Sequence, residues 1–378
     1  MSRPEGPEQP PAAELALARE AEEPALGRDP FDEPLSPDPM VAHLDRLEQR
    51  RGSGPRAARP RPPLRPAPAP APARSEPERR APRLRRPRSP VPTLSEIELE
   101  APRGLAERLL GDDARRVLAA LSHLVEGDGP YDRFGFSPEV TRNTFPLFHA
   151  LYRGWFRVKS EGHQHLPVSG PVVVASNHAG LLPFDAAMSI VDVALHTDPP
   201  RLARAVVDRW AGQLPWVNIF YARVGQVIGT RENFSDLLDE GQMVLVYPEG
   251  VEGVRKTIAQ RYRLQTFRVG FIEHALRAGA PIVPMAVIGS DDQMPILYDV
   301  KPLARRLGLP VAPITPTFPM LGPLGLLPFP VSYKIVYGEP LHFHERFGAE
   351  GADDARLVRY LANQVRREVQ RLMDRNRS

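Results

Sequence analysis

The sequence predicts an α/β fold: a mixed, largely parallel sheet flanked by helices, preceded by a disordered Pro/Arg-rich tail and two amphipathic helices. Short β-rich runs alternate with helical segments from residue 158 onward, which is the pattern of a sheet with parallel strands. Apolar residues recur at helical spacing before that point, and 22 of the 45 prolines lie in residues 1–100. We expect a disordered tail at 1–100, amphipathic helices able to serve as a membrane-interface element at 101–157, and an α/β domain at 158–378.

The tail is distinguished by its charge as well as its prolines. Residues 1–50 carry 12 acids against 5 arginines, a net −7, and residues 51–90 carry 12 arginines against 2 glutamates, a net +10. Such a chain buries too little apolar surface to offset the entropy lost on ordering, so we expect disorder. Anionic lipid is the better partner for the basic stretch, because no nucleic-acid-binding motif accompanies it.

Composition excludes several classes of protein and site. The chain has no cysteine, which excludes disulfide frameworks, thiolate metal sites and cysteine nucleophiles. No apolar signal core follows the first residues, so a cytoplasmic location is expected. The uncharged stretch 307–333 contains seven prolines, and each costs a helix interior roughly 3 kcal/mol. It is predicted as an irregular apolar segment and not as a transmembrane helix.

Two amphipathic helices are predicted ahead of the sheet. The first runs through 101–121, where leucines and a valine recur at helical spacing among arginines and acids. The second runs from Ser137 to about Phe156, because Ser137, Pro138 and Glu139 match the preferences of a helix start. Its aromatic residues are interrupted by arginines, which suits a lipid interface. A helix packed on its own sheet is an equally good interpretation.

The α/β part is predicted to contain six strands and further helices. The strands are expected at 171–176, 203–208, 224–228, 242–247, 281–288 and 332–337. The helices are expected at 185–196, 231–240, 266–278 and 353–375, with Gly241 and Gly279 as C-terminal stops. Active residues of open α/β sheets gather beyond the carboxyl ends of the strands. The loops after these strands are therefore the places where site residues are expected.

A histidine and an aspartate follow the strand at 171–176. Asn177 and His178 come directly after it, and Asp185 opens the next helix, with six residues between His178 and Asp185. An imidazole is a competent base near neutral pH, and a carboxylate on its other ring nitrogen fixes its tautomer and stabilises its cation. Taken alone the signal is weak, because Asp185 can be an ordinary helix cap and His178 an ordinary loop residue.

Three further blocks stand at the ends or inside of later strands. Gly225 and Arg231 stand six apart, and Arg231 begins a helix, where the dipole prefers acids. It is reasonable there if its guanidinium meets an anion such as phosphate. The strand at 242–247 runs into Tyr247-Pro248-Glu249-Gly250, a tight turn with a carboxylate. Pro284 lies well inside its strand, which ordinarily marks an edge or a bulge.

These blocks, in this order, resemble the four sequence blocks of the lysophospholipid (glycerolipid) acyltransferase family. The blocks are Asn177-His178 with Asp185, Gly225 with Arg231, Tyr247-Pro248-Glu249-Gly250, and Ile282-Val283-Pro284. The resemblance covers roughly 155–287. It implies the glycerolipid acyltransferase fold and an O-acyltransferase that moves a fatty acyl group from acyl-CoA or acyl carrier protein to a hydroxyl of a glycerolipid or lysophospholipid. It implies no cofactor beyond this co-substrate, and no metal.

The resemblance also assigns roles to residues. It implies His178 as general base and Asp185 as its orienting carboxylate, with direct transfer and no acyl-enzyme. It implies that the polar head of the acceptor meets Arg231 and Glu249, and that backbone donors near Gly250 support the oxyanion. The substrate-binding residues are then Asn177, Gly225, Arg231, Glu249, Gly250 and Pro284. Both substrates carry long chains, so we expect a peripheral or monotopic enzyme on the cytoplasmic membrane face, with 307–333 as its membrane-facing lip or, alternatively, as a buried covering loop.

Two departures from the family pattern affect these assignments. The family separates its histidine and aspartate by four residues, whereas here the longer loop must bulge to bring Asp185 to the imidazole. The third block usually continues Gly-Thr-Arg, whereas here the next cations after Gly250 are Arg255 and Lys256. The acceptor therefore need not be a lysophosphatidic acid.

Other interpretations have less support. The sequence has no Gly-x-Ser-x-Gly elbow and no glycine-rich phosphate loop, which disfavours a serine hydrolase and a nucleotide-driven reaction. His342 and His344 alternate on an expected extended segment without a third ligand, so they are interpreted as surface residues. The rival hypothesis is a non-catalytic lipid-binding or scaffolding protein whose tail recruits partners. The intact pair of His178 and Asp185 argues against it.

Overall fold

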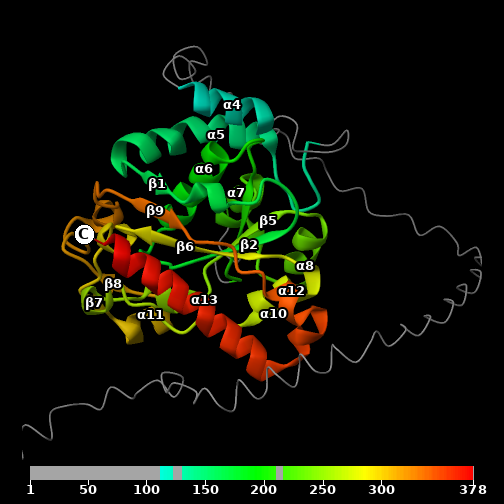
Figure 1. Ribbon diagram of the computed structural model, residues 1–378. Helices are drawn as coiled ribbons and strands as arrows, with labels where there is room; N and C mark the ends of the chain where they lie inside the picture. Colours follow the sequence, from blue (N-terminus) through cyan, green and yellow to red (C-terminus); the bar gives the residue numbers. More distant parts are fainter. Residues whose placement is uncertain (1–110, 122–129, 210–215, 378) are drawn as a thin grey trace, which may run out of the picture. The chain divides into compact units, whose positions relative to one another are not determined.

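The computed structural model describes residues 111–121, 130–209 and 216–377 of the 378-residue chain. The predictions for the tail at 1–100 and for the start of the first helix fall outside these residues. Within them, helices cover the two faces of a central sheet (Figure 1).

A seven-stranded sheet forms the centre of the fold, in the order β1-β9-β6-β2-β5-β3-β4. The strands are β1 (Lys159–Glu161), β2 (Val172–Ser176), β3 (Ala203–Val207), β4 (Val227–Ile228), β5 (Met243–Val246), β6 (Ile282–Ile288) and β9 (Lys334–Tyr337). Every pair of neighbours is parallel except β6 and β9. The predicted fold class, a mixed and largely parallel sheet flanked by helices, is confirmed. Strands β2, β5 and β6 are buried throughout, because helices cover both faces.

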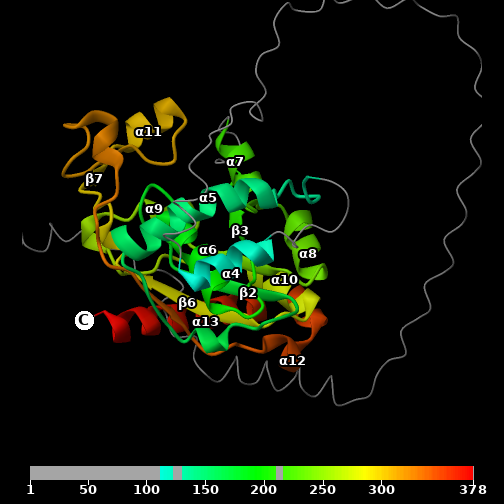
Figure 2. The same ribbon diagram turned by 90° about the horizontal axis from the view of Figure 1, so that it is seen from above.

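Helices lie on the two faces of this sheet. One face carries α4 (Asp112–Leu121), α5 (Pro138–Ala150) and α6 (Phe184–His196), and the other carries α10 (Gly270–Ala278) and α13 (Ala355–Asn376) (Figures 1 and 2). The remaining helices are α7 (Val217–Arg223), α8 (Arg231–Asp239), α9 (Val251–Val254), α11 (Lys301–Leu307) and α12 (Phe343–Phe347). The predicted helices at 185–196, 231–240, 266–278 and 353–375 are confirmed to within a few residues.

Local sequence signals explain where these helices begin and end. The Ser137 hydroxyl accepts a hydrogen bond from the Val140 N–H, and Pro138 occupies the first turn of α5, as predicted. Thr230 caps α8 in the same way by accepting from the Asn233 N–H. Gly279 ends α10 with a φ of 65°, a left-handed conformation that favours glycine.

The second amphipathic helix is packed on the domain along most of its length. Phe145, Tyr152 and Phe156 are buried in one hydrophobic cluster with β2, β5 and α6. The last part of the segment, Leu151–Trp155, forms a π-helical turn. Leu147 and Trp155 remain exposed. Of the two interpretations of this helix, packing on its own sheet accounts for the buried aromatic residues.

Three expectations about local structure were wrong. Strand β4 has only two residues, so Gly225 lies in the turn before it, with a φ of 88°. Pro284 is not at an edge, because β6 pairs with both β2 and β9. Pro284 lies opposite Gly338, one residue past the last pair of the β6–β9 ladder, so the N–H that proline lacks is not needed within that ladder. The Pro284 carbonyl still accepts a hydrogen bond from the Gly338 N–H. His342 and His344 lie at the start of α12 and not on an extended segment.

The apolar segment 307–333 is irregular, as predicted. It contains one short strand, β8 (Pro313–Ile314), which pairs with β7 (Tyr298–Asp299), and a 3-10 helix at Gly322–Leu326. None of the helices in the described residues combines the length and the apolar character needed to cross a membrane.

Candidate active site

The site lies where strands of the sheet end. His178 is two residues beyond the end of β2, and Tyr247 directly follows β5, which is parallel to β2 and paired with it. Their rings are 4.5 Å apart between centroids. This position, beyond the carboxyl ends of adjacent parallel strands, is the one that open α/β sheets use for their sites.

His178 and Asp185 are in direct contact. The His178 Nδ1 atom lies 2.6 Å from an Asp185 carboxylate oxygen, and the same oxygen accepts a hydrogen bond from the Ala179 N–H at 3.0 Å. Asp185 is fully buried in the first turn of α6. The loop with six intervening residues therefore does bring the carboxylate to the imidazole. With Nδ1 held by Asp185, Nε2 is the ring nitrogen left for proton transfer.

A buried glutamine fixes the shape of the His178 loop. The Gln293 side-chain amide donates to the Ala179 carbonyl at 2.9 Å, and its oxygen accepts from the Tyr333 hydroxyl at 2.6 Å. Gly180 has a φ of 85°, and a Cβ atom there would lie 2.1 Å from the Gln293 amide nitrogen. Glycine at 180 is thus required both by its conformation and by the close approach of Gln293.

Glu249 holds the backbone of the same loop by a hydrogen bond. One of its carboxylate oxygens accepts from the His178 N–H at 2.9 Å and the other accepts from the Gln265 N–H at 2.7 Å. The residue is buried, and burial raises the pKa of the Glu249 carboxyl while the nearby Lys256 ammonium opposes that rise. Both oxygens are engaged by the backbone, so in this structure Glu249 positions His178 and does not face a substrate.

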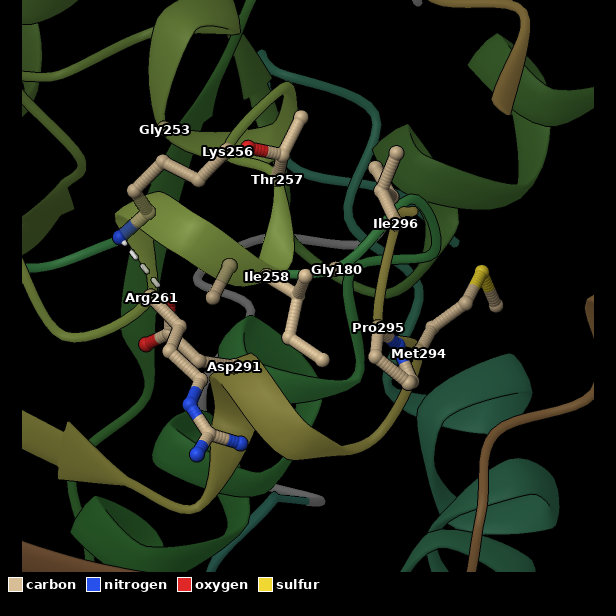
Figure 3. A pocket seen from close by; sticks show the side chains of 11 residues that line it. Gly180, Gly253, Lys256, Thr257, Ile258, Arg261, Asp291, Met294, Pro295 and Ile296 are labelled. Carbon is tan, nitrogen blue, oxygen red and sulfur yellow. Dashed lines mark ion pairs between the residues drawn. The ribbon is translucent and has the colours of Figure 1, made fainter. Parts of the chain in front are cut away.

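Lys256 joins Glu249 to Asp291 in a buried group of three charges. Its Nζ atom lies 3.6 Å from Glu249, and all three side chains are buried. The same atom lies 3.4 Å from Asp291 (Figure 3). Burial also raises the pKa of the Asp291 carboxyl. The adjacent cavity, next to Gly180, holds only about 10 Å³, which is the space of one water molecule at most. This cluster is therefore structural and not a substrate site.

We expect Lys256→Met to destabilise the fold strongly, because it leaves two buried carboxyl groups without their cation. Breaking a buried ion pair costs about 3–5 kcal/mol. Since burial raises both pKa values, the two carboxyls are protonated as pH falls, and the deficit should shrink toward acid pH. Urea unfolding at two pH values measures this.

Arg261→Met is the matched control for that experiment. Arg261 belongs to the same segment but forms a solvent-exposed ion pair with Asp292 at 3.2 Å. Exposed pairs contribute at most about 1 kcal/mol. Equal losses of stability in the two variants, or a Lys256→Met deficit that does not depend on pH, would contradict the structural role of the buried cluster.

His178 opens onto a large cavity of about 800 Å³. One part of its lining is apolar and comes from helices on the α4–α6 face, including Leu121, Phe148, Phe184 and Ile190. Cavities of about 300–1,000 Å³ are typical of small-molecule sites. The volume and the lining can accommodate an apolar chain next to the imidazole.

Arginines line another part of the same cavity. Arg209, Arg231 and Arg268 all contribute to its wall. The Arg231 side chain is 81% exposed. Its ion pair with Glu273 is long, at 3.9 Å. The Arg268 guanidinium lies close over Gly250, where a Cβ atom would come within 2.9 Å of its Cζ. A planar guanidinium in such a wall suits phosphate or carboxylate oxygens.

The later cations expected from the third block face elsewhere. Arg255 forms a two-pronged ion pair with Asp299 at 2.9 and 3.1 Å, and Lys256 belongs to the buried cluster. Neither of them lines the large cavity. Arg268, which follows the third block by 18 residues, is the cation that the fold brings to Gly250.

The other residues expected at the site have varied positions. Gly250 lines the cavity, and its N–H donates to the Tyr247 carbonyl at 2.9 Å. Asn177 is buried and exchanges two hydrogen bonds with the Val287 backbone, so it extends the pairing of β2 with β6. Gly225 packs against Leu202 and Phe136, and Pro284 is buried in β6. Asn177, Gly225, Glu249 and Pro284 do not line the cavity.

Comparisons with known proteins identify the family of this chain. The family model described as "Acyltransferase" matches residues 157–288. An uncharacterized protein of Mycobacterium tuberculosis is 38% identical over 272 residues, which are 70% of this chain and 75% of that protein. An uncharacterized protein of Mycobacterium leprae is 37% identical over 276 residues, covering 71% and 74% of the two chains. The chain therefore belongs to the acyltransferase family, and the predicted resemblance is confirmed.

Two more distant matches are proteins named for lipid substrates or products. A human "DGAT1/2-independent enzyme synthesizing storage lipids" is 23% identical over 225 residues, covering 59% of this chain and 62% of that protein. The crystal structure of PlsC from Thermotoga maritima, named as a 1-acyl-sn-glycerophosphate acyltransferase, matches with a TM-score of 0.39 and 14% identity, covering 68% of this chain and 86% of that one.

Proposed function

We propose that this acyltransferase moves a fatty acyl group from an acyl thioester to a hydroxyl of a glycerolipid or lysophospholipid. The observation that carries the proposal is the His178–Asp185 pair at the wall of a cavity of about 800 Å³ whose lining is apolar in one part and rich in arginine in another. An apolar wall suits the acyl chains, and arginines suit the anionic groups of the substrates.

The proposed reaction is a direct transfer. The Nε2 atom of His178 takes the proton of the acceptor hydroxyl, whose oxygen attacks the thioester carbonyl carbon and forms the new C–O bond. Asp185 holds the imidazole in the required tautomer and stabilises the imidazolium. When the tetrahedral intermediate collapses, the C–S bond breaks and the leaving thiolate takes the proton from His178. The products are an ester and a free thiol, and the enzyme returns to its starting state.

The donor in this proposal is acyl-CoA or acyl carrier protein, and the acceptor is presented by the cytoplasmic face of the membrane. Both donors carry the acyl group as a thioester next to phosphate, and phospholipid acceptors carry phosphate as well. Arg268, Arg231 and Arg209 can meet either partner, since all three line the cavity that His178 shares. Arg268 and Arg231 form long ion pairs, at 3.7 Å with Asp208 and 3.9 Å with Glu273, which a substrate phosphate would replace.

We expect Arg268→Gln to raise the KM of the phosphate-bearing substrate about tenfold with little change in kcat, because a charge-assisted hydrogen bond contributes about 1.5–3 kcal/mol when formed and less when exposed. Thiol release is measured with a lysophospholipid acceptor and with an uncharged monoacylglycerol. A rise confined to the lysophospholipid assigns Arg268 to the acceptor, and a rise in the KM of acyl-CoA with both acceptors assigns it to the donor.

Arg263→Gln is the matched control, because Arg263 is exposed in the same segment and does not line the cavity. Unchanged KM values for both substrates in Arg268→Gln, or equal effects of the two substitutions, would show that the arginine wall does not bind phosphate.

A further inference from the structure

A folded lobe at residues 297–327, here named the apolar lobe, exposes an unusual concentration of large apolar side chains. It contains β7, α11, β8 and the 3-10 helix Gly322–Leu326. Nine of the nineteen exposed large apolar side chains in the described part of the chain lie in these 31 residues. Met320 is 84% exposed and Leu324 is 69% exposed, with Leu321 and Leu327 beside them in sequence. Exposed apolar patches of this kind mark a surface that meets a partner or a membrane.

Hydrogen bonds within the apolar lobe fix the backbone that carries these exposed side chains. Its strands pair through the Leu297 N–H to the Ile314 carbonyl at 2.8 Å and the Val300 N–H to the Ala312 carbonyl at 2.9 Å. The Thr317 hydroxyl donates to the Gly325 carbonyl at 2.8 Å and so fixes the turn that carries Met320. Figure 2 shows α11 and β7 standing away from the sheet and from the helices that cover it. The exposed apolar residues therefore belong to an ordered, hydrogen-bonded surface of the protein.

The exposed charged side chains of the apolar lobe are all positive. No aspartate or glutamate occurs between residues 300 and 338. The one acid of the lobe, Asp299, is buried and paired with Arg255. Lys301, Arg305 and Arg306 on α11 are exposed, and within the described residues none of them forms an ion pair with an acid. The exposed apolar side chains suit the hydrocarbon region of an anionic bilayer, and the free cations beside them suit its headgroup region.

The apolar lobe is also continuous with the large cavity. Pro310, inside the lobe, lines that cavity together with Phe220 of α7. Leu309 and Phe220 are both exposed, as are Ile219 and Trp216 next to Phe220. Two segments with exposed apolar side chains thus contribute to the wall of the cavity.

We propose that the apolar lobe inserts into the headgroup region of an anionic bilayer and sets the cavity mouth against it, so that lipid chains pass between the bilayer and His178 without crossing water. This role for the cavity rests on the proposed function, whereas insertion of the lobe is a physical property that can be measured without turnover. The apolar tip around Met320 and Leu324 enters the lipid, and the α11 cations meet the anionic headgroups.

Site-specific labelling tests the insertion directly, because the chain has no native cysteine. A polarity-sensitive fluorophore is attached to Leu324→Cys in the full-length chain, and vesicles of phosphatidylglycerol and phosphatidylcholine carry quencher-labelled acyl chains. We expect a blue shift and strong quenching. Val168→Cys is the matched control, since Val168 is 55% exposed and lies before β2, at the opposite strand ends. Equal responses at the two positions, or none at Leu324→Cys, overturn the proposal.

A second experiment tests the charge and separates the lobe from the chemistry. The triple variant Lys301→Gln, Arg305→Gln, Arg306→Gln should bind anionic vesicles on the order of 100-fold more weakly, and this loss should fall at high salt because screening shortens the attraction. Its turnover on detergent-dispersed substrate should equal that of the wild type. Equal vesicle binding by the variant overturns the proposal, and so does a stable dimer in lipid-free buffer that Leu324→Asp dissociates. Inactive wild-type enzyme with normal insertion would refute the proposed function alone.

Discussion

His178→Ala is expected to lower the rate of thiol release from the acyl thioester by about 10³-fold, within the range that general-base catalysis contributes. The substitution removes the Nε2 atom that takes the proton of the acceptor hydroxyl. The fold should persist, because the side chain lies at the cavity wall, and the Asp185 carboxylate keeps its hydrogen bond from the Ala179 N–H. The measurement is the initial rate of free thiol formation with each thioester donor, together with a circular dichroism spectrum.

His342→Ala is the control for this prediction. His342 is exposed directly before α12 and does not line the large cavity. Its replacement should leave the rate unchanged. A His178→Ala variant that is folded and retains wild-type turnover with the productive donor would remove His178 from the mechanism.

Asp185→Asn should also lower turnover, by about 10²-fold, which is less than the loss in His178→Ala. The Asp185 oxygen that faces Nδ1 also accepts from the Ala179 N–H, and the other oxygen accepts from the Ala186 N–H, so the asparagine NH2 group must meet one of these two donors. In the position that faces Nδ1, the NH2 group donates to Nδ1 and favours the tautomer in which Nε2 carries the proton. The imidazole remains, so a minor population can still act as base. The ratio of kcat/KM for the two enzymes gives the loss of transition-state stabilisation.

Asp198→Asn is the matched control, because Asp198 is an exposed acid just beyond the other end of α6. Its replacement should have no effect on kcat/KM. Wild-type activity in Asp185→Asn would mean that the 2.6 Å contact with His178 does not serve catalysis and that another carboxylate orients the base.

The sequence predicted the elements whose signals are local. The valine-rich runs at β2, β5 and β6 are buried on both faces, and such continuous apolar runs mark central strands. Ser137 and Thr230 begin their helices through their own side chains. The contact of His178 with Asp185 was foreseen from the family blocks, although only the conformation of Gly180 and the position of Gln293 explain how the longer loop achieves it.

Elements and site residues that depend on distant partners were not predictable. Strand β1 has the sequence Lys-Ser-Glu and exists because its backbone pairs with β9, about 175 residues later. Gln293 reaches the His178 loop across 114 residues. Arg255 and Lys256 were the two candidates for the cation that follows the third block, but Lys256 is buried beside Asp291, which lies in a different segment of the chain. A cation near Gly250 was foreseen, and its identity as Arg268 follows only from the path of the chain.

Product analysis tests the central claim most directly. The purified full-length chain is incubated with an isotopically labelled acyl thioester and vesicles that contain a lysophospholipid, and the lipid extract is analysed by mass spectrometry alongside that of His178→Ala. The account predicts a diacyl lipid that carries the labelled chain as an ester, formed in equal amount to free thiol, and absent with the variant. A labelled free fatty acid in place of the ester, or the same ester yield from His178→Ala, would contradict it.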